Sequence, residues 1–235
     1  MNVNSPMTKK YTVEVVASAN DHAVHLPDMT EADVRAHAAM CIERKVASLC
    51  VRPCDVKLAA ELLKDSPVMV SCVLSFPHGA DATPVKAFQA KQAIEDGVQE
   101  IDMVINIGQF LAGNDDVVRE DIRAVVEVAH ASGVKVKVIQ ESGLLTLEQV
   151  ARACELSREA GADFVKTSTG FNSTPATPEI IAVMLETVGD SMQVKPSGGI
   201  RDWKTAVAYL EQGCHRLGVA STEAVLDGGA GDGDD

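Results

Sequence analysis

Short apolar runs alternate along the chain with longer segments in which apolar residues recur at intervals of three and four. The runs are rich in Val, Ile and Leu and are bounded by Gly, Pro or small hydroxyl residues, which is typical of buried β-strands. They predict strands over residues 47–53, 68–76, 99–105, 134–140, 163–168, 192–198 and 215–220. A further strand, the first of eight, is predicted over residues 23–26.

The segments between these runs predict amphipathic helices. They cover residues 30–45, 83–97, 116–133, 146–161, 177–189 and 202–213. Thr30 is the expected N-cap of the first helix because Asp33 follows three residues later, and most of the segments end on glycine. Residues 11–17 could form either a helix or a short strand.

Strands that alternate with helices of this size form βαβ units and a parallel sheet. Eight such units imply an α/β fold of the closed (β/α)8 type, a TIM barrel, although an open doubly wound sheet remains an alternative. No shift in composition divides the chain, so residues 1–235 are predicted to form one domain. Residues 1–10 are expected to be loose, and residues 227–235 to form a mobile acidic tail.

Composition and charge narrow the class of protein. Hydrophobic residues make up 46% of the chain but aromatic ones only 3%, which favours a core of aliphatic side chains. The formal net charge of −13 argues against nucleic acid or an anionic membrane as a partner. No apolar stretch is long enough to cross a bilayer.

The six cysteines are scattered, and no signal peptide precedes them. Reduced thiols in the cytoplasm are therefore expected rather than disulfides. Cys50 and Cys54 lack further His or Cys residues at metal-ligand spacing, so no metal site is predicted.

Lys166 lies within the apolar run of residues 163–168, near the expected carboxyl end of the strand. Burial disfavours the ammonium form and would leave a neutral amine able to attack a carbonyl carbon. The alternative is a lysine whose alkyl stem packs while its ammonium group reaches water.

Two further charged residues fall at the same end of the predicted barrel, where active sites of this fold lie. Lys195 is at the comparable position of the next strand, so its positive charge should lower the pKa of Lys166 further. Asp102 interrupts another apolar strand and could serve as a proton shuttle or as a structural ion-pair partner. Lys135 and Lys137 are rival nucleophiles on the strand of residues 134–140.

Small residues after the last three strands suggest a phosphate site. Ser197, Gly198 and Gly199 precede a helix expected to begin near Arg201, so backbone N–H groups there could converge on an anion. The other members of this predicted cup are Gly170, Gly218 and Ser221.

Four segments resemble the deoxyribose-phosphate aldolase family. They are SLCVRPCDV at 48–56, EIDMVINIG at 100–108, DFVKTSTGF at 163–171 and VKPSGGIRD at 194–202, and they occur in the order and at the spacing of the family. The resemblance runs from about Asp21 to Ser221.

The resemblance implies a Schiff-base aldolase that reversibly cleaves 2-deoxy-D-ribose 5-phosphate to acetaldehyde and D-glyceraldehyde 3-phosphate. It implies no metal or other cofactor, and a possible homodimer. Lys166 would form the imine, Lys195 would hold its pKa down and Asp102 would relay protons. Lys137 resembles a barrel lysine without the Schiff-base role, and Cys50 a cysteine near the substrate.

The chain also departs from the family pattern. The segment from Asp21 to Pro27 reads DHAVHLP where many members have DHTLLKP. The departures that bear on the site are Ala23, Leu26, Arg52 and Ala220, where the family often has Thr, Lys, Asn and Ser. Two alternatives therefore remain: a lysine aldolase or transaldolase for another phosphorylated sugar, and a barrel that only binds a phosphorylated metabolite.

Overall fold

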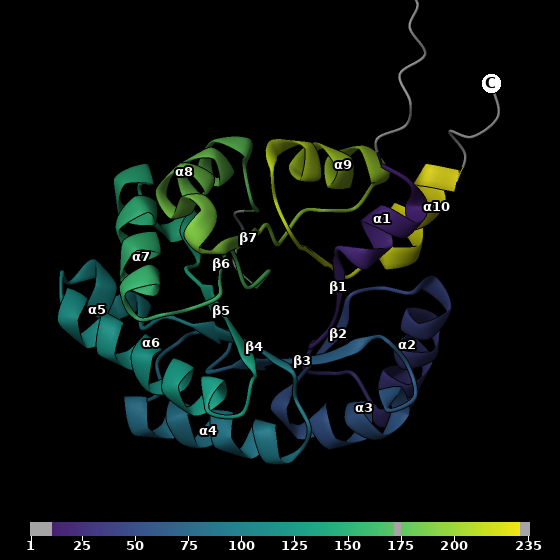
Figure 1. Ribbon diagram of the computed structural model, residues 1–235, viewed down its shortest axis with the longest axis horizontal. Coiled ribbons are helices and arrows are strands. Elements are labelled where there is room, and N and C mark those ends of the chain that lie inside the picture. The colour runs from purple at the N-terminus through teal and green to yellow at the C-terminus, as the bar shows by residue number, and fades with distance from the viewer. Residues whose placement is uncertain (1–10, 172–174, 231–235) are drawn as a thin grey trace, which may run out of the picture.

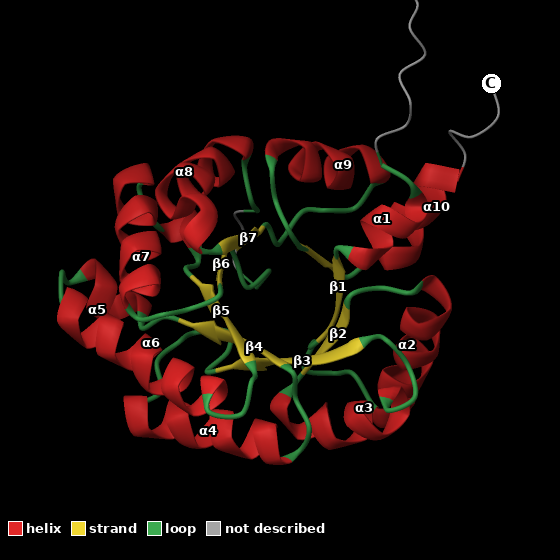
Figure 2. Cartoon of the chain, viewed as in Figure 1, coloured by secondary structure: helices red, strands yellow, loops and turns green. Residues whose placement is uncertain are grey.

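The eight strands of the protein form one parallel sheet that curls into a barrel surrounded by helices (Figures 1 and 2). This computed structural model describes residues 11–171 and 175–230. The strands are β1 Asn20–Val24, β2 Ser48–Val51, β3 Met69–Leu74, β4 Glu100–Val104, β5 Lys135–Ile139, β6 Phe164–Lys166, β7 Gln193–Lys195 and β8 Leu217–Val219.

The barrel closes between β7 and β8 through a short junction. The ladder order runs from β7 through β6 to β1 and β8, and an isolated parallel bridge joins Ser197 to Gly218. The backbone N–H of Gly218 donates to the carbonyl of Pro196 over 2.9 Å, and that of His215 donates to Val194 over 3.0 Å. The predicted (β/α)8 barrel is thus confirmed, and the open doubly wound alternative is wrong.

The helices lie outside the sheet, where their apolar sides pack on the strands. The α-helices are α1 Val13–Ser18, α2 Glu31–Arg44, α3 Val56–Leu63, α4 Thr83–Glu95, α5 Ile107–Leu111, α6 Asp115–His130, α7 Leu147–Glu159, α8 Pro178–Val188, α9 Trp203–Gln212 and α10 Thr222–Ala230. Thr30 caps α2 in a capping box with Asp33, as its sequence predicts. None of the helices in the described part of the chain is long and apolar enough to span a membrane.

The amino-terminal part of the barrel differs from the sequence expectation. Strand β1 begins at Asn20 and ends at Val24, so the prediction of residues 23–26 was placed too late. The physical reason is that Asn20, Asp21 and His22 are polar but buried: Asn20 and His22 hydrogen-bond to Thr222, and Asp21 accepts a hydrogen bond from Ser48. Residues 11–17 are mostly helical, in α1.

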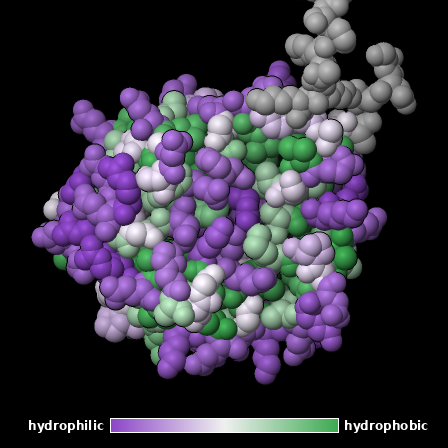
Figure 3. Space-filling view, in the orientation of Figure 1, coloured by the Kyte–Doolittle hydropathy of each residue, from purple (hydrophilic) through white to green (hydrophobic). Residues whose placement is uncertain are grey.

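The carboxyl-terminal end also differs from the expectation. Helix α10 reaches Ala230, so the residues numbered 227 to 230, which were expected to belong to a mobile tail, are helical. The rest of that tail, and the loose segment 1–10, lie outside the described residues. On the face drawn in Figure 3, hydrophilic side chains cover much of the surface, in keeping with the charged residues of the sequence.

Candidate active site

Asp102 of β4 lies at the centre of a buried cluster of charges inside the barrel. Its Oδ2 atom accepts hydrogen bonds from Lys166 Nζ and Lys195 Nζ, each over 2.8 Å. Its Oδ1 atom accepts one from Lys137 Nζ over 3.0 Å. The strand register explains this meeting, because Asp102 pairs with Lys137 across β4 and β5, and Lys166 pairs with Lys195 across β6 and β7.

Three more charged side chains complete this cluster, and the sequence analysis missed all of them. Asp21 contacts Lys195 Nζ at 2.6 Å and Lys137 Nζ at 3.2 Å. Glu100 contacts Lys137 Nζ at 2.6 Å and Arg216 at 2.7 Å. Arg216 also pairs with Asp21, so the carboxylates and cations form one connected set.

The cluster has an excess of basic groups. Among the ion pairs of the described residues, it joins four basic side chains, of Lys137, Lys166, Lys195 and Arg216, to three carboxylates. With every group ionised, one positive charge would lack compensation in the protein interior, which is costly. A neutral amine at one lysine removes this imbalance.

Lys166 is the lysine best placed to be that neutral amine. Lys137 contacts three carboxylates and Lys195 contacts two, whereas Lys166 contacts only Asp102. Burial lowers the pKa of Lys166 and the charge of Lys195 lowers it further, against the opposing effect of Asp102. The result is a pKa below the ordinary value of lysine.

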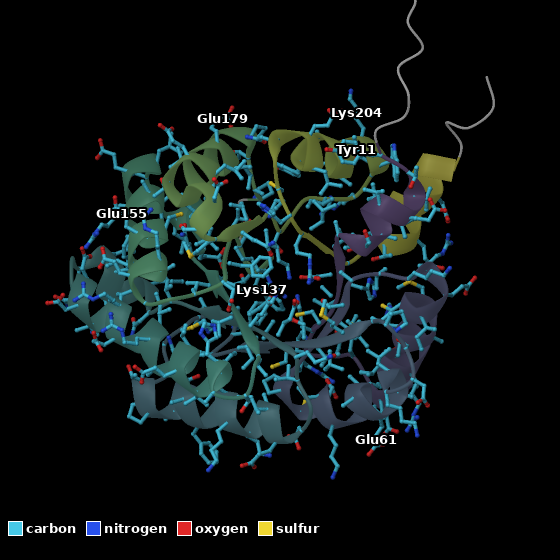
Figure 4. The ribbon with its side chains drawn as sticks, in the orientation of Figure 1. Tyr11, Glu61, Lys137, Glu155, Glu179 and Lys204 are labelled. Carbon is cyan, nitrogen blue, oxygen red and sulfur yellow. The ribbon has the colours of Figure 1, made fainter. Side chains whose placement is uncertain are left out.

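The other two lysines of the cluster, Lys137 and Lys195, are held in their cationic form. Although burial lowers the pKa of Lys195, Asp102 and Asp21 raise it above its ordinary value. Burial also opposes ionisation of Lys137, but its carboxylates raise the pKa well above the ordinary value. Figure 4 shows Lys137 at the centre of the barrel. Lys135 is exposed at the beginning of β5, away from this cluster.

A cavity of about 240 Å³ opens over the lysines. Of the residues that the sequence identified as catalytic or substrate-binding, all but one line it: Lys166, Lys195, Cys50, Gly170, Gly198, Gly199, Gly218 and Ser221. The exception is Asp102, which lies behind the lysines and is fully buried. A ligand in this cavity can therefore contact Lys166 and Lys195 directly, but reaches Asp102 only through them.

The segments after β6, β7 and β8 bring small residues to the cavity wall, together with the larger Phe171, Ile200 and Arg201. Gly198 and Gly199 have φ angles of +85° and +79°, a conformation that favours glycine and can turn successive N–H groups toward an anion. A Cβ atom on Gly199 would lie 2.8 Å from the Cβ of Pro175. Ser221 directly precedes helix α10, so the amino terminus of that helix lies beside the cavity.

The amino terminus of α9 contributes less to the candidate anion site than the sequence suggests. The helix begins at Trp203 rather than near Arg201. Its N-cap Asp202 accepts a hydrogen bond from the backbone N–H of Thr205 over 2.9 Å, so a carboxylate already satisfies this terminus. The loop N–H groups and the terminus of α10 are the better anion donors.

Cys50 lies at the cavity wall but its thiol is not activated. The residue is buried, and burial raises its pKa above the ordinary value even though lysines lie nearby. A neutral thiol of this kind behaves as a small apolar side chain.

The positions at which the chain departs from the family pattern surround the cavity. Three of them line it: Ala23, Leu26 and Ala220. Arg52 instead holds the loop after β1, because its guanidinium donates to the carbonyls of Leu26 and Met29 over 3.3 and 2.8 Å. Arg52 therefore holds in place the loop that carries the lining residues Leu26 and Met29.

Besides Asp21, the polar lining residues His25, His37 and Thr169 were missed by the sequence analysis. Thr169 donates from its hydroxyl to the buried carboxylate of Glu141 over 2.5 Å. His25 lies one residue beyond the end of β1. Within residues 11–171 and 175–230, no group of three His, Cys, Asp or Glu side chains is arranged to hold a metal ion.

A (β/α)8 barrel whose cavity exposes a buried lysine with a lowered pKa has the architecture of a lysine-dependent aldolase. A family model described as DeoC/LacD family aldolase matches residues 15–222. The chain belongs to this family.

Relatives and solved structures agree with this membership. A deoxyribose-phosphate aldolase of Streptococcus suis is 50% identical over 215 residues, which cover 91% of this chain and 96% of the relative. One of Geobacillus sp. is 48% identical over 216 residues, covering 91% and 95%. A tetrameric deoxyribose phosphate aldolase from Aeropyrum pernix superposes with a TM-score of 0.86 at 29% identity, covering 92% of this chain and 91% of that one.

Proposed function

We propose that this protein reversibly cleaves 2-deoxy-D-ribose 5-phosphate to acetaldehyde and D-glyceraldehyde 3-phosphate through a Schiff base on Lys166. The single observation that carries the proposal is the contrast among the buried lysines. Lys166 alone combines a lowered pKa with a place on the cavity wall. The names of the relatives at about half identity supply the substrate.

The neutral amine of Lys166 attacks the aldehyde carbon of the open-chain sugar, and loss of water gives a protonated imine. This cation accepts the electron pair of the carbon–carbon bond as the neighbouring hydroxyl loses its proton, which releases D-glyceraldehyde 3-phosphate and leaves an enamine. Protonation of the enamine carbon and addition of water then release acetaldehyde and restore the amine.

Lys195 has two roles in this scheme. Its positive charge keeps Lys166 deprotonated, and its ammonium group lies at the cavity wall where it can deliver a proton to the carbinolamine oxygen. Asp102 bonds to both lysines through one oxygen, so it carries protons between them and keeps them in position. The raised pKa of Lys195 suits a proton donor that is recharged after each step.

The phosphate of the substrate binds to the cup of Gly170, Gly198, Gly199, Gly218 and Ser221. Backbone N–H groups of this cup and the amino terminus of α10 would bind the anion and hold the sugar chain for attack by Lys166. Cys50 lies against the substrate as an apolar contact. The reaction requires no metal or other cofactor.

The proposal also covers the location of the enzyme in the cell, its partners and its oligomeric state. We expect no nucleic-acid or membrane partner, because the net charge of −13 disfavours polyanionic partners. A cytoplasmic location is expected from the reduced thiols, and a possible homodimer from the family resemblance. Light scattering after size-exclusion chromatography tests the dimer; a monomer would remove that part of the proposal.

The substrate assignment is tested by comparing rates on 2-deoxy-D-ribose 5-phosphate and on a ketose phosphate. We expect the deoxy sugar to be preferred by roughly a hundredfold or more in kcat/KM, because relatives that share about half of the sequence are deoxyribose-phosphate aldolases. A preference for the ketose phosphate would favour the transaldolase alternative. Calorimetric binding of the sugar phosphate without turnover would favour the binding protein.

A further inference from the structure

His25 occupies a fixed position at the wall of the lysine cavity. Its ring contacts two phenylalanine rings, with centroid distances of 5.0 Å to Phe76 and 5.6 Å to Phe171. Those two rings meet edge to face at 5.2 Å. The three rings come from the segments that follow β1, β3 and β6, so aromatic packing from separate parts of the barrel holds the imidazole in place.

The imidazole of His25 has one buried nitrogen, Nδ1, without a hydrogen-bond partner in the described part of the chain. The neighbouring His22 differs, because its nitrogens bond to Thr222 and to His37, each over 2.8 Å. Buried polar atoms are nearly always hydrogen-bonded, so an unpaired one beside a ligand cavity indicates that a ligand or its water supplies the partner.

The ring is neutral over the physiological range. Burial is the main cause that lowers the pKa of His25 to about 4, and positive charge on the neighbouring lysines acts in the same direction. A neutral imidazole has one donor and one acceptor nitrogen, so it can bind a hydroxyl group, which also offers both.

Other polar side chains line the cavity, but they belong to the charged cluster, to the hydrogen-bonded pair of His22 and His37, or to the loops around the glycine cup. The proposed function uses Lys166 at the aldehyde end and the glycine cup at the phosphate end. Thr169 already donates its hydroxyl proton to Glu141, and Ala23 has no polar atom to offer. His25 therefore stands out as a lining residue with unused hydrogen-bonding capacity.

We propose that His25 determines specificity by hydrogen-bonding a hydroxyl group of the acceptor aldehyde, so that the site favours hydroxylated acceptors over those without the hydroxyl. This inference rests on the proposed aldolase function. The physical basis is that an acceptor without the hydroxyl leaves the imidazole of His25 without a hydrogen-bond partner in the complex, which weakens binding of that acceptor. An apolar side chain at position 25 needs no such partner, so replacing the imidazole removes this difference between the two acceptors.

The test is synthesis from acetaldehyde with two acceptors: D-glyceraldehyde 3-phosphate, and 3-oxopropyl phosphate, which is the same aldehyde without the hydroxyl. The unmodified enzyme should prefer the hydroxylated acceptor by about tenfold or more in kcat/KM. His25→Leu should reduce that preference by about tenfold. His25→Gln, which keeps a donor and an acceptor, should retain it to within about threefold.

Borohydride trapping with acetaldehyde alone controls for damage to the lysine, since acetaldehyde has no hydroxyl for His25 to bind. His25→Leu should form the reduced adduct at the rate of the unmodified enzyme. An unchanged acceptor preference in a variant that still traps acetaldehyde would overturn the role of His25 while leaving the aldolase intact. Equal losses with both acceptors would also overturn it, whereas absence of any adduct in the unmodified enzyme would remove the aldolase proposal itself.

Discussion

At the scale of single residues, the chemistry depends on how many buried carboxylates each lysine of the cluster contacts. Lys137 and Lys195 contact more than one carboxylate each and stay charged, whereas Lys166 shares a single oxygen of Asp102 with Lys195. The same cluster thus contains two lysines with raised pKa values and one, Lys166, whose pKa is lowered. The nucleophile and the proton donor are both lysines, so the difference between their pKa values comes from the residues around each of them.

Lys166→Ala should lower kcat by roughly a thousandfold or more, because no other residue supplies a neutral amine at the cavity wall. The measurement is a coupled assay of D-glyceraldehyde 3-phosphate release. Lys135→Ala is the matched control, since that side chain is exposed at the start of β5 and should leave the rate unchanged. Substantial turnover by Lys166→Ala would mean that another group forms the imine.

Lys195→Leu should move the acid limb of the kcat/KM pH profile to higher pH. Removing the positive charge of Lys195 favours protonation of Lys166, so the pKa of Lys166 rises and more base is needed to produce the free amine. The variant should also be slower at every pH because the proton donor is missing. A profile whose acid limb stays in place would contradict the electrostatic role of Lys195.

The sequence allowed prediction of some of these residues and not of others. Lys166, Lys195 and Asp102 interrupt apolar strands, where a charge is conspicuous. Asp21 and Glu100 stand at or near the polar starts of their strands, and Arg216 follows a histidine, so each fits an exposed strand end equally well. Only the closed barrel brings them within reach of Lys137 and Lys195, and that convergence depends on register.

At the scale of elements, the junction of β7 and β8 is the point where the barrel closure and the phosphate cup coincide. Gly218 of β8 faces Ser197, which follows β7, in an isolated bridge. A Cβ atom on Gly218 would lie 2.5 Å from Ser197 Oγ and 2.9 Å from Ser197 Cβ. The absence of a side chain at Gly218 therefore allows both the closure and the approach of the substrate.

Gly218→Ala should destabilise the fold by about 1–3 kcal/mol and raise KM for the sugar phosphate, because the added methyl group pushes Ser197 away from β8. Thermal unfolding and steady-state kinetics measure the two effects. Gly108→Ala is the control: it lies in helix α5, where the nearest atom to the added Cβ would be 3.8 Å away. Equal melting temperatures and equal KM values for the two variants would contradict this account of the junction.

The elements themselves were largely predictable because apolar periodicity and caps are local. Seven of the strands coincide with their apolar runs, and Thr30 caps α2 as expected. Strand β1 was misplaced because its first three residues, Asn20, Asp21 and His22, are polar although they are buried, so hydrophobic periodicity carries no signal there. Helices α3, α5 and α10 were not predicted: α3 follows a proline-containing segment, α5 is only five residues long, and α10 runs into a glycine-rich acidic segment.

At the scale of the whole molecule, a charged cluster fills the interior where a barrel of this kind usually packs apolar side chains. Burial raises the pKa of Asp21 and of Asp102, but the surrounding basic residues lower both below the ordinary value. The pKa values of these two carboxyl groups are therefore lower in the folded state than in the unfolded state. The carboxylates stabilise the fold at pH values above the unfolded-state pKa, and this stabilisation is lost as the pH falls through the folded-state pKa values.

The melting temperature should therefore fall as the pH is lowered past about 4, near the unfolded-state pKa of aspartate. Asp21→Asn should show a shallower decline over that range, because one of the buried carboxylates no longer takes up a proton on unfolding. Asp190→Asn, on the exposed surface, should keep the decline of the unmodified protein. A decline in Asp21→Asn as steep as in the control would contradict the link between the cluster and acid stability.

Imine formation at Lys166 is the claim on which the whole account depends. The purified protein is incubated with acetaldehyde and borohydride, digested, and mapped by mass spectrometry. We predict one reduced two-carbon adduct, on Lys166, with Lys135, Lys137 and Lys195 unmodified at stoichiometric labelling. An adduct on Lys137 or Lys195 instead would contradict the assignment of roles within the cluster, and the absence of any specific adduct would contradict Schiff-base catalysis by this protein.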